Sequence, residues 1–221
     1  LFRDLGVDFV IDYASRFGIR SPLERDLSLA LGSSSMTLLE LTTAYSVFPN
    51  QGRLIAPRFI RRVSRRNGTV LLEDVLLGDS AKGSAKDELE IAQAGANEPG
   101  TPGSEPEGIP SEGPTDRVIS EAYAYLMSDL LSAVVQEGTG RGLRRLGRPL
   151  AGKTGTTNEQ GDAWFMGFSP DLTTGVWVGH DDNRLLGFGE TGAGAALPVW
   201  RDFMRVALAD REIRDFEVPG E

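Results

Sequence analysis

Short apolar runs separated by turn-forming residues mark positions 150–180 of the chain. We expect strands at 150–157, 162–168 and 173–180. The links between them, 158–161 and 169–171, are rich in Asn, Gly, Ser, Pro and Asp and are too short for a parallel crossover. The pattern therefore predicts an antiparallel meander of three strands.

Helical spacing of apolar residues predicts helices on either side of this meander. The first covers 7–17 and ends at Gly18, and the second opens at a capping box formed by Thr37 and Glu40. A long helix runs from Ser120 to about 136, and a last one, with Pro198 in its first turn, lies near 198–209. The expected apolar face of the long helix consists of Tyr123, Leu126, Met127, Leu130 and Val134. The predicted fold class is α/β or α+β, an antiparallel sheet packed with helices.

Residues 59–72 predict a β-hairpin around Asn67 and Gly68, the strongest short hairpin signal. The hairpin carries four arginines, Arg61, Arg62, Arg65 and Arg66. Such a ribbon can bind an anion, but we favour the interpretation that its charges are solvated and block pairing at its edges.

The net charge of −9 comes from one segment. Residues 73–116 contain eleven Asp or Glu and two Lys, which leaves 21 acidic and 21 basic residues elsewhere. Because no broad basic surface is implied, nucleic acid is not expected as a partner. Within this segment, residues 95–114 are mostly Gly, Pro and Ser, so we expect a flexible acidic insertion at about 78–116.

Several kinds of site are disfavoured by composition. The chain has no cysteine and a single histidine, so disulfides and an ordinary zinc site are not expected, nor is any metal or cofactor. No apolar run approaches the roughly 20 residues of a membrane span. The chain begins without Met and opens directly into a helical pattern, so we expect a cut within a larger protein, with any membrane anchor upstream.

Two motifs compete for Lys153. Residues 147–154 match the phosphate-loop pattern G-x-x-x-x-G-K-[ST], which needs a buried strand before it and a helix starting at the lysine. The flanking residues favour neither element, so nucleotide binding is the least favoured of the functions that we consider. The other motif is K-T-G on a strand, the third motif of the serine acyl transferases that include penicillin-binding proteins and class A β-lactamases.

The residues around K-T-G resemble the transpeptidase domain of class A penicillin-binding proteins. The resemblance is carried by GRPLAGKTGTTNEQGDAWFMGFSPDLTTGVWVGHDD at 147–182, DLSLALGSSSMTLLELTTAYSVFPNQG at 26–52 and RVISEAYAYLMSDLLSAVVQEGTG at 117–140. The glycine-rich loop at 187–194 and PVWRDFM at 198–204 continue it. Nearly the whole chain is covered except the acidic insertion, as the C-terminal part of one transpeptidase domain spanning 1–221.

The resemblance implies a cell-wall enzyme on the outer face of the cytoplasmic membrane. In that family a serine attacks the D-Ala-D-Ala end of a peptidoglycan stem peptide, and β-lactams acylate the same serine. Here the implied substrate-binding residues are Lys153, Thr154, Gly155 and Thr156. Lys153 and the two threonine hydroxyls would bind the peptide carboxylate, and Gly155 would leave the strand edge open. The implied catalytic residues are Lys153 and Thr156, whose backbone N–H is the candidate oxyanion donor.

The chain departs from the family in lacking two motifs. No S-x-x-K and no S-x-N occurs; the nearest candidate, Ser33, has Met36 where the lysine is required. In the family both motifs lie upstream of the segment matching this chain, so we expect truncation, and this chain alone to be inactive and not labelled by fluorescent penicillin. One alternative is an inactive remnant that binds cell-wall peptide or a protein partner. A β-lactamase-type hydrolase is disfavoured, because the matched segments resemble transpeptidases.

Other chemically suggestive residues have structural interpretations. The tryptophans Trp164, Trp177 and Trp200 lie in apolar patterns and are expected in the core. Asp162 is expected to hydrogen-bond within a turn. His180 with Asp181 is not expected to form a catalytic triad, because nothing else in the pattern supports that geometry.

Overall fold

The computed structural model describes residues 2–75, 117–156, 161–182, 184–187 and 189–220. The chain divides into two units, residues 1–55 with 115–221 and residues 56–114, and each is considered by itself. The insertion predicted at about 78–116 lies outside the described residues.

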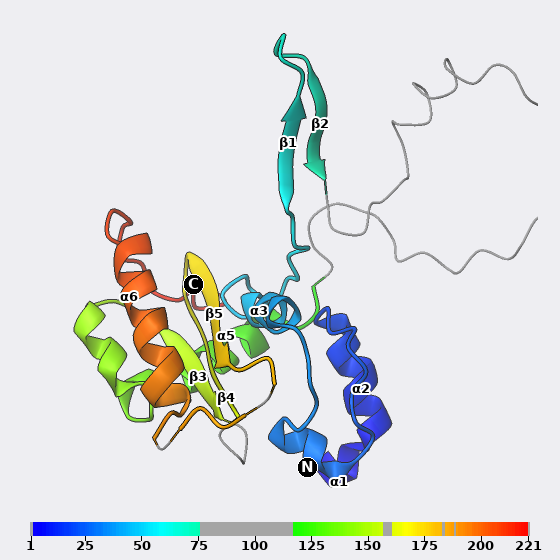
Figure 1. Ribbon diagram of the computed structural model, residues 1–221, viewed down its shortest axis with the longest axis vertical. Coiled ribbons are helices and arrows are strands. Elements are labelled where there is room, and N and C mark those ends of the chain that lie inside the picture. Colours follow the sequence, from blue (N-terminus) through cyan, green and yellow to red (C-terminus); the bar gives the residue numbers. More distant parts are fainter. Residues whose placement is uncertain (1, 76–116, 157–160, 183, 188, 221) are drawn as a thin grey trace, which may run out of the picture. The chain divides into compact units, whose positions relative to one another are not determined.

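The first unit is built on the predicted meander. It contains β3 (Ala151–Thr156), β4 (Asp162–Ser169) and β5 (Leu172–Gly179), antiparallel and in the order β3-β4-β5 (Figure 1). Every β3 residue has a partner on β4, and the β4–β5 pairing extends from Asp162 to Ser169 without a bulge. The predicted mixed fold with an antiparallel sheet is therefore confirmed.

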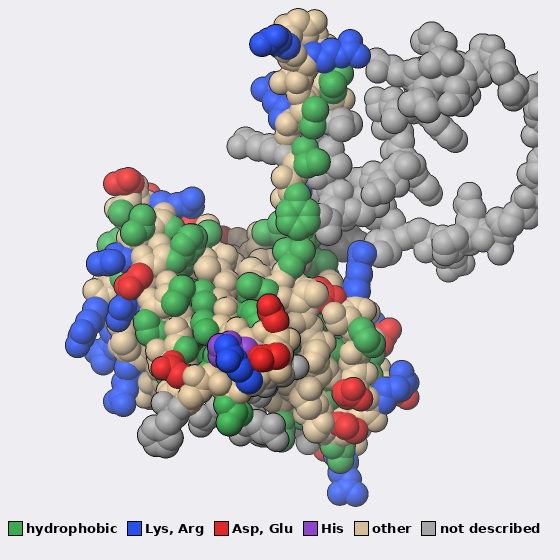
Figure 2. All heavy atoms as spheres, in the orientation of Figure 1, with side chains coloured by type: hydrophobic (Ala, Val, Ile, Leu, Met, Phe, Trp, Pro, Cys, Tyr) green, Lys and Arg blue, Asp and Glu red, His purple; other side chains and the backbone are tan. Residues whose placement is uncertain are grey.

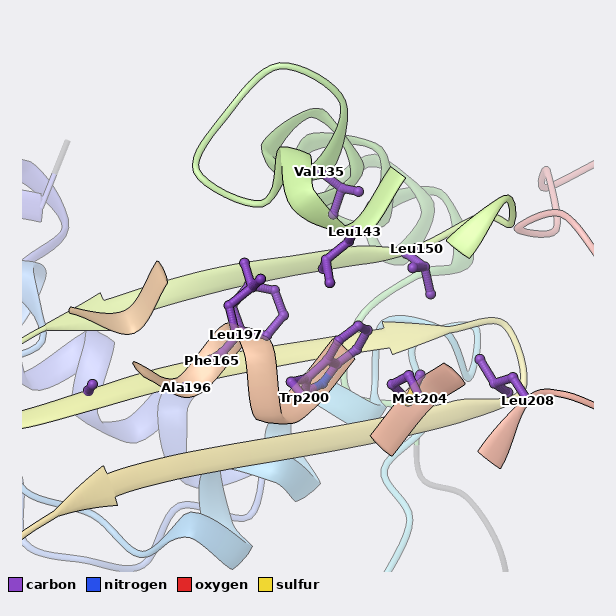
Figure 3. Packing of buried hydrophobic residues seen from close by; sticks show 10 residues of the cluster. Val135, Leu143, Leu150, Phe165, Ala196, Leu197, Trp200, Met204 and Leu208 are labelled. Carbon is purple, nitrogen blue, oxygen red and sulfur yellow. The ribbon is translucent and has the colours of Figure 1, made fainter. Parts of the chain in front are cut away.

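One face of the sheet is covered by α6 (Leu197–Ala207). Trp200 of this helix is fully buried, its ring lies edge-on to Phe165 at 5.1 Å between centroids, and its indole N–H donates to the carbonyl of Thr174 at 2.9 Å. Figure 3 shows the cluster that these side chains form with neighbouring helices. Its buried members are Val135, Leu143, Leu150, Ala163, Phe165, Ala196, Leu197, Trp200, Met204 and Leu208.

The opposite face is covered by α3 (Leu38–Ser46) and α5 (Glu121–Gln136). Phe168 is three positions from Phe165 on β4 and so points to the other side of the sheet, because side chains alternate along a strand. There Phe168 packs with Leu131 of α5, with Ala151, and with the aromatic ring of Phe48. The two faces together make a layered helix–sheet–helix core.

The predicted helix boundaries agree with the structure. The Thr37 side chain accepts from the Glu40 N–H and the Glu40 carboxylate accepts from the Thr37 N–H, which completes the capping box. Ser120 caps α5 by accepting from the Tyr123 N–H, and Pro198 lies in the first turn of α6. The remaining helical segments are α1 (Phe2–Leu5), α2 (Val7–Arg16), η1 (Leu27–Leu31), η2 (Arg141–Leu146) and the π-turn η3 (Gly192–Ala196). Among the helices that the structure describes, none is long and apolar enough to cross a membrane.

The predicted apolar face of α5 is wrong. Leu130 is 63% exposed, whereas the next residue, Leu131, is 8% exposed. The buried positions of the helix are Ala124, Ser128, Leu131 and Val135, while the predicted positions Tyr123, Leu126, Met127 and Leu130 are exposed and Val134 is half-buried. The buried face includes the small residues Ala124 and Ser128, and α5 packs against β3.

The second unit contains the predicted hairpin, β1 (Ile60–Ser64) paired antiparallel with β2 (Val70–Val75). Gly68 has a φ of 87°, and the Thr69 N–H donates to the Asn67 side chain, so both turn residues act as predicted. Figure 2 shows side chains of the Lys and Arg class near the turn of the hairpin and hydrophobic side chains along its strands.

Backbone hydrogen bonds join the two segments of the first unit that flank the second unit in sequence. Arg53 and Arg117 form an isolated antiparallel bridge, and the Val118 N–H donates to the Gly52 carbonyl at 2.7 Å. A Cβ on Gly52 would lie 2.0 Å from the carbonyl oxygen of Ile119, and Gly52 has a φ of 83°. Glycine is therefore required at this junction, which we call the seam (residues 52–53 and 117–119).

Candidate functional site

The site predicted around Lys153 lies on a strand at the edge of the sheet. In the described part of the chain, β3 pairs with β4 on one side only. Lys153 is exposed, and its ammonium donates to the Thr154 carbonyl at 2.8 Å. Because Lys153 lies within a strand and not at the start of a helix, the structure does not support the phosphate-loop alternative.

The two threonines of the motif point to the same face of the sheet. Thr154 lies opposite Phe165 and Thr156 opposite Ala163, and both of these partners belong to the core beneath α6. Thr154 is half-buried and Thr156 is exposed. Lys153 and Gly155, at the alternate positions, point to the other face.

A glycine-rich turn approaches the backbone of β3 from the α6 side. A Cβ on Gly192 would lie 2.5 Å from the carbonyl oxygens of Gly155 and Trp164, so no larger residue fits at this position. The Gly192 N–H donates to the Thr156 hydroxyl at 3.0 Å. The turn therefore lies against the backbone carbonyl of Gly155.

A second hydroxyl lies beside the strand. Thr139, in the turn after α5, has its Oγ1 3.0 Å from the Oγ1 of Thr154 and is exposed. Sequence reasoning missed both Thr139 and Gly192. The only signal was that each lies within a segment resembling the family, 117–140 and 187–194.

Asp162, which we predicted to hydrogen-bond within a turn, accepts hydrogen bonds from two indole groups. Its Oδ2 accepts the indole N–H of Trp164 at 3.0 Å and that of Trp177 at 3.2 Å. Trp177 is 39% exposed and Trp164 half-buried, so the prediction of a core position is right for Trp200 and wrong for Trp177. Asp162 therefore joins the two indoles at the end of the sheet where β3 stops.

The arrangement offers donors along an open strand. A cation at Lys153, hydroxyls at Thr154 and Thr156, and the free edge of the backbone together suit an extended peptide that ends in a carboxylate. A cavity of about 200 Å³ lies elsewhere, lined by residues such as Phe48, Tyr125 and Phe216. Among the residues with described positions, no group of three or more His, Asp or Glu is placed to hold a metal ion.

Comparisons with known proteins identify the family and the fold to which the chain is similar. The family model described as the penicillin binding protein transpeptidase domain matches residues 4–205. The chain is 35% identical to penicillin-binding protein 1A of Pseudomonas aeruginosa and 36% identical to that of Aquifex aeolicus, covering all of this chain but 29% and 25% of those relatives. A crystal structure of penicillin-binding protein 1A from Haemophilus influenzae superposes with a TM-score of 0.76 at 31% identity, covering 99% of this chain and 33% of that one.

Proposed function

The chain belongs to the family of penicillin-binding protein transpeptidase domains, and from this premise we propose that β3 binds the C-terminal carboxylate of a peptidoglycan stem peptide. The observation that carries the proposal is the position of Lys153, which is exposed on an edge strand that also carries Thr154 and Thr156. The same residues would bind the carboxylate of a β-lactam.

Lys153, Thr154 and Thr156 supply different parts of this site. The ammonium of Lys153 provides the positive charge, and the hydroxyls of Thr154 and Thr156 each provide a donor. Gly155 adds no side chain, so a peptide can lie against the strand and pair with its backbone. The backbone N–H of Thr156 is the candidate donor to the oxyanion that forms at the attacked carbonyl.

The reaction of the whole protein is D,D-transpeptidation in this proposal. A serine oxygen attacks the carbonyl of the penultimate D-Ala, an ester forms, and the terminal D-Ala leaves with the proton that the serine gave up. An amine of a neighbouring stem peptide then displaces the serine and forms the cross-link. The chain spans about a quarter of the relatives it matches, and the serine and its partner lysine are not among its 221 residues. In our proposal, therefore, the chain supplies the carboxylate-binding strand and does not acylate by itself, and the whole protein acts on the outer face of the cytoplasmic membrane.

The proposal is tested by the binding of two peptides that differ at one group. Titration of the chain with a peptide ending in D-Ala-D-Ala, followed by NMR, is expected to show tighter binding for the free acid than for its C-terminal amide. Lys153→Met is expected to weaken acid binding about tenfold or more, because a charge-assisted bond is lost, and to leave amide binding nearly unchanged. Arg205→Met, which removes an exposed charge from α6, is the matched control.

Equal binding of acid and amide by the unaltered chain would overturn the proposal. The absence of the nucleophile motifs favours a second candidate, an inactive remnant that binds cell-wall peptide. This second candidate predicts the same preference of this chain for the acid form. The two candidates differ in what they predict for the whole protein: in the second, no penicillin would become covalently attached.

A further inference from the structure

We propose that Thr139 is a positioning residue for the carboxylate site, holding the Thr154 hydroxyl so that its proton points to the bound peptide. The inference deepens the proposed function of β3 and rests on it. It starts from the 3.0 Å contact between the hydroxyls of Thr139 and Thr154, which come from different elements and lie 15 positions apart in the chain.

Counting protons shows why this contact matters. A hydroxyl has one proton and two acceptor lone pairs, so the pair Thr139–Thr154 uses one proton for its mutual bond and keeps one for another acceptor. A carboxylate only accepts. When it lies against Thr154, Thr154 must donate to it, and Thr139 must then donate to Thr154. Thr139 thereby stabilises the one hydroxyl orientation that the ligand requires.

The neighbouring threonine is held in the same manner, which is an independent observation. The Gly192 N–H donates to the Thr156 hydroxyl at 3.0 Å, and an N–H cannot accept in return. The proton of Thr156 is therefore also left for an outside acceptor. The Thr156 hydroxyl thus receives a hydrogen bond from Gly192. In our proposal the Thr154 hydroxyl receives one from Thr139, so that both threonines retain a proton to donate.

One of these two donors precedes β3 in the sequence and the other follows it. Thr139 comes from the turn between α5 and η2, and Gly192 begins η3. Because Gly192 has no room for a Cβ, its amide can reach Thr156 only as glycine. We infer that this face of β3 is prepared to bind an acceptor with two oxygens, before any ligand is present.

The experiment compares Thr139→Val with Thr139→Ser, using the acid and amide forms of the D-Ala-D-Ala peptide on the 221-residue chain. Valine keeps the shape of threonine and removes the hydroxyl, so acid binding is expected to weaken about threefold to tenfold, the worth of one hydrogen bond. Amide binding is expected to remain unchanged, and serine is expected to restore acid binding. Thr173→Val, the same substitution on β5, is the matched control and is expected to leave the ratio of acid to amide affinity unchanged.

Each outcome decides the matter. If the unaltered chain prefers the acid and Thr139→Val keeps that preference in full, the inference is wrong and the proposed function stands. If Thr139→Val weakens acid and amide equally, Thr139 has only a structural role and the inference is also wrong. If the unaltered chain shows no acid preference, the proposed function fails and the inference fails with it.

Discussion

Glu40 is the residue at which hydrogen bonding most clearly outweighs burial. Its carboxylate accepts the backbone N–H groups of Arg20 and Ser21, both at 2.8 Å, and the Ser21 hydroxyl at 2.6 Å, in addition to the capping bonds from Thr37. Burial would raise the pKa of Glu40, but these bonds favour the charged form and lower the pKa from 4.5 to about 2. One carboxylate thus ties the segment after α2 to the start of α3.

The lowered pKa of Glu40 predicts that acid weakens the fold. A group with a depressed pKa in the folded state stabilises it fully above its unfolded value, here near 4.5, and this contribution is lost as the pH falls towards about 2. Glu40→Gln keeps a capping-box side chain without the charge. It is expected to reduce the free energy of unfolding at pH 7 by about 1 kcal/mol and to flatten its decline between about pH 5 and 2.

The pH dependence is measured by urea unfolding at several pH values. Glu137→Gln, the same change at an exposed position after α5, is the control and should retain the slope of the unaltered chain. An unchanged slope in Glu40→Gln would show that the hydrogen bonds to this carboxylate do not depend on its charge.

At the same scale, the candidate site was predictable only where its residues are neighbours in sequence. Lys153 to Thr156 form a contiguous motif, and turn residues on both sides of the sheet segment indicated a strand. Thr139 and Gly192 lie 15 and 36 positions from the threonines they contact. Their roles depend on a turn and a loop that reach the strand only after folding, and no local pattern indicates such contacts.

At the scale of elements, turn chemistry predicted the strands better than periodicity predicted helix faces. The meander and the Asn67–Gly68 hairpin follow from turns that few other residues can form. Helix α5 carries two candidate faces, one of large apolar residues and one of Ala, Ser, Leu and Val. The local pattern favoured the more hydrophobic face, but the packing of α5 against β3 buries the other one, a tertiary constraint absent from the local pattern.

Two adjacent leucines of α5 test this assignment. Leu131→Ala removes a buried side chain from the cluster with Phe168 and is expected to lower the free energy of unfolding by about 2–4 kcal/mol. Leu130→Ala, the matched substitution one residue earlier, changes an exposed side chain and is expected to alter stability by less than about 0.5 kcal/mol. Thermal or urea unfolding measures both, and equal losses would contradict the orientation of the helix.

At the scale of the whole molecule, the seam allows the first unit to fold without residues 56–114. The hydrogen bonds from Val118 and Ile119 to the Gly52 carbonyl lie within the first unit, so they do not require residues 56–114. The segments on the two sides of the seam also share one core, since Phe48 packs against Phe168.

Replacement of residues 56–114 by a short Gly/Ser linker is therefore expected to leave the first unit folded. Its melting temperature should change by only a few degrees, because shortening a loop alters its closure entropy little. Circular dichroism during heating measures this. The same shortened chain with Gly52→Ala is the control and should melt markedly lower, since the added Cβ would lie 2.0 Å from the Ile119 oxygen. Loss of a cooperative transition in the shortened chain itself would show that the second unit is needed for folding.

The seam has a consequence for how this family of sequences can diversify. Doubling the length of a chain segment between two fixed points adds only about 0.6 kcal/mol of closure entropy. Genetic insertions and deletions between residues 56 and 114 are therefore nearly neutral for the first unit, whereas a change at Gly52 is not. We expect natural variants to differ greatly in the length of the segment between residues 56 and 114. We expect them to keep a glycine at the position of Gly52.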